Sequence, residues 1–328
     1  MKILYAVQGT GNGHLCRALD IIPALKKFGE VDVLVSGIQA DIGLPFDVKY
    51  KLHGLSFIFG KSGGVDLWRT FMSSTVRKFI QEINSLPVEN YDLIINDFEP
   101  ISAWACQSRD IPCVGLSHQI AALDAASPKS EESDMLGKFI MKNYAPSSSS
   151  YGFHFKSYSN QIFTPVIRQS IRELDPQDKG HYTVYLPAYD DAHLLKNLAK
   201  FPDVKWDVYS KHNKRPFTVK NVSINPIQSD TFVKSMANSS GVLCGAGFET
   251  PAEALFLGKK LLVVPMKNQY EQHLNAAALE QMGVPVIFNL KKKNDYAIES
   301  WLNSETKITV DYPDNTQEII SSIVEKHK

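Results

Sequence analysis

The sequence has few cysteines, no excess charge of either sign and no long apolar run. Its 328 residues include 4 cysteines, and 35 Lys and Arg residues balance 35 Asp and Glu residues. A neutral chain lacks the basic surface that broad nucleic-acid binding requires. No apolar run approaches the roughly 18 to 20 residues of a membrane span, and the first apolar strand is too short for a signal peptide. We therefore predict a cytoplasmic protein with no nucleic-acid partner and no transmembrane segment, and peripheral membrane contact stays open.

Several ligand motifs are missing as well. The cysteines lack metal-ligand spacing, and no Asp-x-Asp pair ends a suitable strand, so we expect no metal. Two glycine turns, at residues 9–13 and 245–247, follow apolar segments of the chain. Neither ends in the Gly-Lys-Ser/Thr of a P-loop, which argues against ATP hydrolysis. The first turn runs Gly-x-Gly-x-Gly, and the second strand ends in Ser36 instead of the acidic residue that holds a ribose. This departure argues against NAD.

Strands alternate with helices in both halves of the chain. In the first half we expect strands at 3–7, 31–36, 92–96 and 112–116 and helices at 14–28, 66–86 and 101–109. In the second half the expected strands are 182–186, 205–210, 222–225, 241–244, 261–265 and 286–289. Such alternation predicts parallel sheets with helices on both faces. We assign domains to residues 1–165 and 181–314, with a link at 165–180 and a last helix at 315–328.

The pattern fails between residues 127 and 159. A charged segment at 129–134 and a serine run at 147–150 flank a short amphipathic helix at 136–144. Long loops in compact domains often act as lids or recognition segments. Acceptor binding and disorder without function both remain open for this stretch.

The more informative glycine turn follows the strand at 241–244. Gly245 and Gly247 let a ligand approach the backbone. Thr250 is the expected N-cap of the next helix, Pro251 its first residue, and Glu253 completes a capping box. Free N–H groups and the helix dipole favour an anion at such an end. The turn is therefore a predicted phosphate site.

These residues resemble the donor-binding region of GT-B nucleotide-sugar glycosyltransferases. After Glu253 the likeness continues through a strand ending at Pro265 to Glu271, Gln272 and Asn275. It is a likeness to the UDP-glycosyltransferase superfamily and to the related GlcNAc transferase that acts on the peptidoglycan lipid intermediate. In the first half, the glycine loop at 11–14 resembles the N-terminal loop of those enzymes. The segments at 97–100 and 117–119 are similar to a less characterised bacterial and archaeal branch.

The resemblance implies a fold and an activity. The fold is α/β of the GT-B type, with two Rossmann-like parallel-sheet domains facing across a cleft and the helix at 315–328 packing back on the first domain. The activity is transfer of a hexose or N-acetylhexosamine from a UDP-sugar to an acceptor hydroxyl. The UDP-sugar is a co-substrate, and no cofactor is expected. The acceptor, which is lipid, glycan, protein or small molecule, stays open.

The resemblance also assigns roles in donor binding. Thr250 would lie at the diphosphate, and Glu253 would accept from the ribose hydroxyls unless it only caps its helix. Glu271 and Gln272 would hold the donor sugar unless they form only a solvated helical turn. Gly245 stands where plant members carry a histidine. The expected donor residues are Gly245, Gly247, Phe248, Thr250, Glu253, Glu271 and Gln272.

His14 is the expected general base. It follows the first glycine turn at the carboxyl edge of the sheet, where ligands of such folds bind, and histidine suits proton removal near neutral pH. In the plant enzymes the matching histidine is oriented by an aspartate that ends a later strand, a place that Asp97 holds here. The alternative is that His14 only contacts the acceptor or the loop. Further acceptor-side or cleft residues are Gly11, Asn12, Gly13, Arg17 and His118.

The predicted reaction is inverting and metal-independent, with the leaving diphosphate neutralised by the helix N-terminus at Thr250. One alternative is an enzyme like the UDP-GlcNAc 2-epimerases, which share the fold but would need further carboxylates in the cleft. Another is a catalytically silent sugar-nucleotide-binding subunit. The presence of both His14 and Asp97 favours catalysis, because a binder needs neither.

Overall fold

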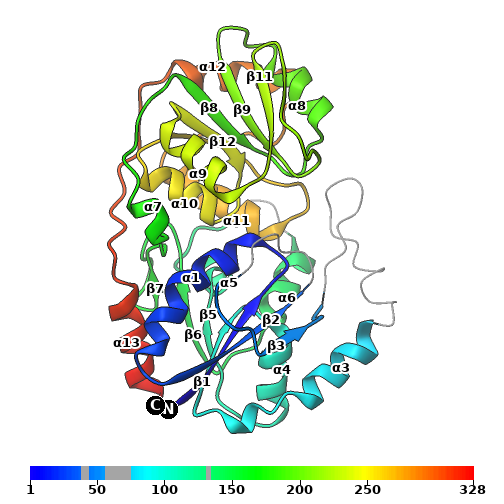
Figure 1. The fold of residues 1–328 in the computed structure, drawn as a ribbon, viewed down its shortest axis with the longest axis vertical. Coiled ribbons are helices and arrows are strands. Elements are labelled where there is room, and N and C mark those ends of the chain that lie inside the picture. The colour runs from blue at the N-terminus through cyan, green and yellow to red at the C-terminus, as the bar shows by residue number, and fades with distance from the viewer. Residues whose placement is uncertain (38–43, 56–74, 131–133) are drawn as a thin grey trace. The chain divides into compact units, whose positions relative to one another are not determined.

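The computed structural model describes residues 1–37, 44–55, 75–130 and 134–328. These residues form two compact units. Unit 1 holds the described residues of Met1–Ser127 and Ser133–Arg168 together with Tyr312–Lys328, and unit 2 holds those of Pro128–Glu132 and Gln169–Asp311. Each unit contains one sheet with helices packed on it (Figure 1).

The sheet of unit 1 is parallel throughout. Its strands are β1 (Lys2–Gln8), β2 (Glu30–Ser36), β3 (Tyr50–Leu52), β4 (Leu93–Asp97), β5 (Val114–Leu116), β6 (Ser149–Phe153) and β7 (Ile162–Phe163). They lie in the order β3-β2-β1-β4-β5-β6-β7. The order reverses between β1 and β4, where Val7 pairs with Asp97. Ligands of doubly wound sheets bind outside the carboxyl ends of the strands at this reversal.

The helices of unit 1 are α1 (Asn12–Lys26), α3 (Thr75–Ser85), α4 (Pro100–Ser108), α5 (His118–Leu123), α6 (Met135–Asn143) and α13 (Thr316–His327), with a 3-10 turn at Val88–Asn90. The last of these, α13, packs on α1 (Figure 1). Its apolar side, which includes Ile320, is buried in unit 1. A helix was expected at 66–86, and α3 covers its second half. The first half, with the apolar residues Trp68 and Met72, lies outside the described residues.

The described residues between 127 and 159 form more regular structure than the sequence suggests. Besides α6 they include β6, which continues the parallel sheet beside β5. Two serines open β6, and only its last three residues are buried. This short apolar end is too brief to give a periodic signal, which explains why the sequence did not predict the strand.

The sheet of unit 2 is also doubly wound, but it has an antiparallel pair at one edge. Its strands are β8 (His181–Tyr185), β9 (Lys205–Ser210), β10 (Phe217–Val219), β11 (Val222–Pro226), β12 (Gly241–Gly245) and β13 (Lys260–Val264). Their order is β10-β11-β9-β8-β12-β13, and only the β10–β11 pair is antiparallel. The order reverses between β8 and β12, so the glycine turn after β12 lies at the reversal. The hydrophobic core of unit 2 includes Trp206 and Trp301.

The helices of unit 2 are α7 (Gln169–Arg172), α8 (Asp191–Leu198), α9 (Ser229–Asn238), α10 (Glu249–Phe256), α11 (Tyr270–Gln281) and α12 (Asp295–Asn303), with a 3-10 turn at Lys292–Asn294. The strand expected at 286–289 is wrong. Only Val286 forms a bridge, to Val263, and Phe288 is exposed, so the apolar run leaves the sheet. In the part of the chain that the structure describes, no helix is long and apolar enough to cross a membrane.

Candidate active site

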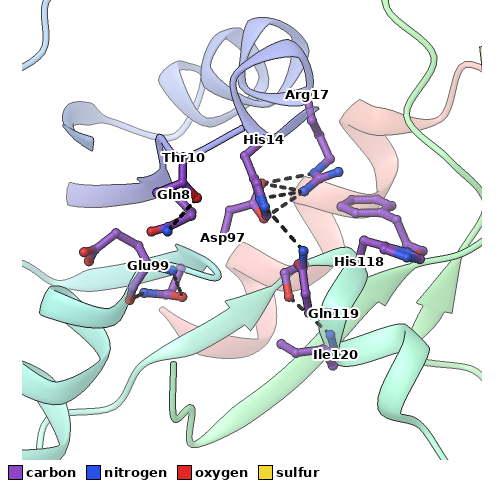
Figure 2. Close-up of polar contacts among 12 residues, drawn as sticks. Gln8, Thr10, His14, Arg17, Asp97, Glu99, His118, Gln119 and Ile120 are labelled. Atoms are coloured by element: carbon purple, nitrogen blue, oxygen red, sulfur yellow. Dashed lines mark hydrogen bonds and ion pairs between the residues drawn. The ribbon is translucent and has the colours of Figure 1, made fainter. Parts of the chain in front are cut away.

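The turn after β1 brings His14 to the end of β4. Gly11 has an extended conformation and is the N-cap of α1, so His14 lies in the first helical turn. Asp97 is the last residue of β4. The Nδ1 atom of His14 lies 2.8 Å from Oδ1 of Asp97, although the two residues are 83 positions apart (Figure 2). The pair predicted from the sequence is therefore in hydrogen-bonding contact at the reversal of strand order.

Arg17 completes this cluster. It follows His14 by three positions on α1 and therefore lies on the same helical face. Its Nη2 atom lies 2.8 Å from Oδ1 and 2.9 Å from Oδ2 of Asp97, and its Nε donates to Oδ2 at 3.1 Å. Asp97 is fully buried and Arg17 is 2% exposed. The guanidinium thus holds both oxygens of a carboxylate that water does not reach.

The protonation of the His14–Asp97 pair follows from this environment. Burial raises the pKa of Asp97, but the charges of Arg17 and His14 and their hydrogen bonds outweigh it and hold that pKa below its usual value. An ionised carboxylate has no proton to donate, and the 2.8 Å contact therefore requires a proton on Nδ1 of His14. The lone pair of the neutral ring is then on Nε2.

The backbone turn after Asp97 is strained and firmly held. Phe98 has a φ of 56°, a region that bulky residues rarely adopt. Asn96 closes the turn, because its side chain donates to the carbonyl of Glu99 at 2.6 Å and accepts from the Glu99 N–H at 3.0 Å. The Phe98 ring is nearly parallel to that of His14, at 6° and 6.4 Å between centroids. The turn therefore presents an aromatic face beside the histidine.

Gln119 reaches the other nitrogen of His14. Ser117 caps α5 by accepting from the N–H of Ile120 at 3.3 Å, and this cap places the next residues at the edge of the sheet. The amide nitrogen of Gln119 lies 3.3 Å from Nε2 of His14 (Figure 2). His118, the residue expected here, has its Nδ1 2.8 Å from the carbonyl oxygen of Phe153 and is buried. His118 anchors α5 on β6, and Gln119 is the residue at the base.

The remaining acceptor-side residues form the glycine turn. Asn12 and Gly13 open α1, and a Cβ built on Gly11 would meet nothing within 4 Å. Gln8 supports the turn from β1, because its amide donates to Oγ1 of Thr10 and to the hydroxyl of Tyr144, both at 2.9 Å. Open space above the backbone leaves room for a ligand beside His14.

In unit 2, α10 begins earlier than expected and has no capping box. Phe248 is the N-cap, with helical φ and ψ, and its own side chain makes no capping hydrogen bond. The first intrahelical bond runs from Ala252 N–H to the carbonyl of Phe248. Pro251 fits the first turn because an N–H there needs no helical partner. Thr250 is thus in the first turn, and Glu253, 2% exposed, is not part of a cap.

The first two turns of α11 support the glycine turn after β12. Asn275, fully buried, donates its side-chain amide to the carbonyl of Ala246 at 3.0 Å. Gln272 accepts the N–H of Met266 at 2.9 Å, and its Oε1 would lie 3.6 Å from a Cβ at Gly245. The predicted residues Gly245 and Gln272 are therefore brought together. Asn275 adds a support that the sequence suggested only through the resemblance.

Gly247 is half-buried in this turn, like Gly245. A Cβ at Gly247 would have nothing within 4 Å, so packing within the chain does not require glycine there. Glu271 lies in the first turn of α11, one position before Gln272. Among the residues that the structure describes, no group of three or more His, Cys, Asp or Glu side chains could hold a metal ion.

Comparison with known proteins identifies the class. Solved structures with this fold include UGT89C1 of Arabidopsis thaliana in complex with UDP, at 12% identity and a TM-score of 0.59 over 99% of this chain and 94% of that one. MurG of Acinetobacter baumannii gives 13% and 0.56 over 99% and 98%, and the glycosyltransferase SnogD of Streptomyces nogalater gives 13% and 0.53 over 100% and 95%. The fold is that of the GT-B glycosyltransferases.

The family follows from the sequence itself. Residues 1–304 match the model described as Glycosyl transferase family 1. The chain belongs to this family and is a glycosyltransferase, which confirms the resemblance and the fold class inferred above. A search of the curated proteins found no match.

Proposed function

We propose that the protein transfers a hexose or N-acetylhexosamine from a UDP-sugar to an acceptor hydroxyl, with inversion at the anomeric carbon. The observation that carries this proposal is the contact between His14 and Asp97 at the reversal of strand order in unit 1. The ring has its lone pair on Nε2, and His14 is 12% exposed while Asp97 is fully buried. His14 is thus the member of the pair that an acceptor can reach.

In the proposed reaction His14 is the general base. The acceptor hydroxyl gives its proton to Nε2 of His14 while its oxygen bonds to the anomeric carbon. The bond from that carbon to the diphosphate oxygen breaks, and UDP leaves with the electron pair. Attack opposite the leaving group inverts the configuration. Asp97 keeps the ring oriented and stabilises the imidazolium, and Arg17 keeps the carboxylate ionised.

Unit 2 is the proposed donor-binding domain and unit 1 the acceptor domain. α10, whose N-cap Phe248 makes no side-chain cap, would offer first-turn N–H groups, including that of Thr250, to the diphosphate. Gly247 leaves space for that approach. We assign Glu253 to the ribose and Glu271 and Gln272 to the sugar. The complex of UGT89C1 with UDP supports a uridine nucleotide as the donor carrier.

Release of UDP tests this function. Wild-type protein is incubated with UDP-glucose and UDP-GlcNAc, with and without acceptor extracts, and free UDP is measured. We expect release that depends on the extract. An epimerase would instead convert UDP-GlcNAc to its 2-epimer without an acceptor, and a silent binder would release no UDP.

Binding of UDP to Glu253→Ala should weaken by about 1 to 3 kcal/mol, because a charged acceptor is lost. Unchanged affinity would remove Glu253 from the nucleotide site.

The location and the independence from metal are part of the same proposal. We expect the protein to act in the cytoplasm, where nucleotide sugars are available as co-substrates. The diphosphate is stabilised by the α10 N-terminus, so the proposed reaction requires no metal. Transfer that stops on treatment with EDTA and returns with Mg²⁺ would contradict this part.

A further inference from the structure

Gln119 lies on α5 and has no role in the proposed proton transfer or bond exchange. Its side chain is buried in unit 1, at 4% exposure. Its amide nitrogen lies 3.3 Å from Nε2 of His14, the atom that must take the acceptor proton (Figure 2). The base thus has a neighbour on each ring nitrogen, with Asp97 at Nδ1 and Gln119 at Nε2.

The two contacts require the same tautomer. Asp97 is ionised and can only accept, so Nδ1 of His14 carries a proton. In the neutral ring Nε2 is then an acceptor, and the Gln119 amide is a donor directed at it. Arg17, 3.2 Å from Nδ1, can only donate, so it cannot hydrogen-bond to the protonated nitrogen and serves Asp97 instead. The whole cluster is consistent with one arrangement of protons.

We propose that Gln119 is a positioning residue for the base: it donates to Nε2 of His14, fixes the tautomer with its lone pair on that atom, and holds the lone pair until the acceptor hydroxyl replaces the amide. This rests on the proposed role of His14. Nε2 has a single lone pair in the ring plane, so amide and hydroxyl bind there in turn. Ser117 supports this role by capping the helix that carries Gln119.

The protonation and hydrogen bonding of the two ring nitrogens of His14 can be measured directly, by ¹⁵N NMR of histidine-labelled protein without substrates. The His14 signals are assigned by their loss in His14→Ala. We expect a protonated Nδ1 and an unprotonated, hydrogen-bonded Nε2 in the wild type. In Gln119→Leu the Nε2 signal should move toward that of an unbonded nitrogen. In Gln119→Glu, where the carboxylate can only accept, both nitrogens should be protonated at neutral pH, because Asp97 and Arg17 are unchanged.

Kinetics give the second readout. Partners that orient metal-bound histidines typically contribute about 10- to 100-fold. By analogy, Gln119→Leu should lower kcat about ten-fold while KM for the UDP-sugar stays the same. Gln119→Glu should lose about as much as His14→Ala, roughly two to four orders of magnitude. Gln107→Leu, an exposed glutamine on α4, is the matched control and should behave as wild type in both measurements.

The outcomes separate this inference from the proposed function. An Nε2 signal that is the same in the wild type and in Gln119→Leu overturns the role of Gln119 even if transfer proceeds. Full activity of Gln119→Glu does the same, and this variant, with the same side-chain shape, covers the case in which the leucine variant does not fold. Failure of the wild type to release UDP from any UDP-sugar overturns the function and leaves the NMR result standing.

Discussion

Arg17 and Asp97 form the most tightly held ion pair of the site. Both are buried, and three Arg17–Asp97 contacts lie between 2.8 and 3.1 Å. A buried ion pair contributes little net stability against an apolar pair, but loss of one partner leaves an uncompensated charge. The pair is therefore better explained by its effect on His14, which it keeps beside an ionised carboxylate.

The shifted pKa of Asp97 makes the stability of the protein pH-dependent in a defined direction. Its pKa is lowered in the folded chain, and an unfolded aspartate titrates at about 3.9. The folded state therefore gains stability from this carboxylate above about pH 4, and loses it as the pH falls through the lower folded value.

We expect Asp97→Asn to reduce the unfolding free energy most near neutral pH. The difference from the wild type should shrink as the pH falls below about 4, because the unfolded wild-type chain takes up a proton at this carboxylate at a higher pH than the folded chain does. Urea unfolding at several pH values measures both chains. A difference that is the same at pH 3 and pH 7 would show that ionisation of Asp97 does not stabilise the fold.

In both units the proposed site residues lie at the ends of helices and strands. In unit 1, α1 begins at the turn after β1, and the caps of α4 and α5 position the residues after β4 and β5. In unit 2, the turn between β12 and α10 is held by Asn275 from α11. The site residues therefore depend on short connections that particular hydrogen bonds hold in place.

Asn275 offers a test of this dependence. Asn275→Ala removes the donor to the buried carbonyl of Ala246, and an unsatisfied buried acceptor costs about 1 to 3 kcal/mol. We expect that loss of unfolding free energy together with weaker UDP binding in calorimetry. Asn238→Ala is the control, because its side-chain amide bonds within α9 to the carbonyl of Lys234. Equal UDP affinity in all three proteins would mean that the turn does not bind the diphosphate.

Periodic elements could be predicted from the sequence, and contacts between distant residues could not. Apolar strands and the amphipathic α1 have strong local signals, and His14 and Asp97 were placed by the strands that they follow. The capping motif at Thr250 predicts too late a start for α10. Phe248 already has helical φ and ψ, and a capping motif does not reveal the backbone conformation of the residues before it. Gln119 and His118 are adjacent on α5, and only the fold decides which of them reaches His14.

The two units have separate hydrophobic cores, so the proposed ligand site of each unit can be tested separately. The core of unit 2 is built on Trp206 and Trp301, whereas that of unit 1 includes Leu4 and Ile94. Unit 1 also takes in the end of the chain, since α13 packs against α1. Damage to one core is expected to leave the ligand site of the other unit intact.

Ile320→Ala tests this separation. Ile320 is fully buried in α13, and loss of such a side chain costs about 2 to 5 kcal/mol. We expect unit 1 to unfold at lower temperature in calorimetry, while the UDP affinity measured below that transition is unchanged. A drop in UDP affinity under those conditions would place part of the nucleotide site under the control of unit 1.

The central claim is that His14 removes the acceptor proton while the nucleotide binds elsewhere. Its most direct test is the comparison of wild type, His14→Ala and Asp97→Asn by acceptor-dependent UDP release and by UDP calorimetry on the same preparations. We expect a fall in turnover of roughly two to four orders of magnitude for His14→Ala. The expected fall is smaller for Asp97→Asn, and UDP affinity should be nearly unchanged in both. Near-normal turnover in His14→Ala, or a large loss of UDP affinity, would contradict the account.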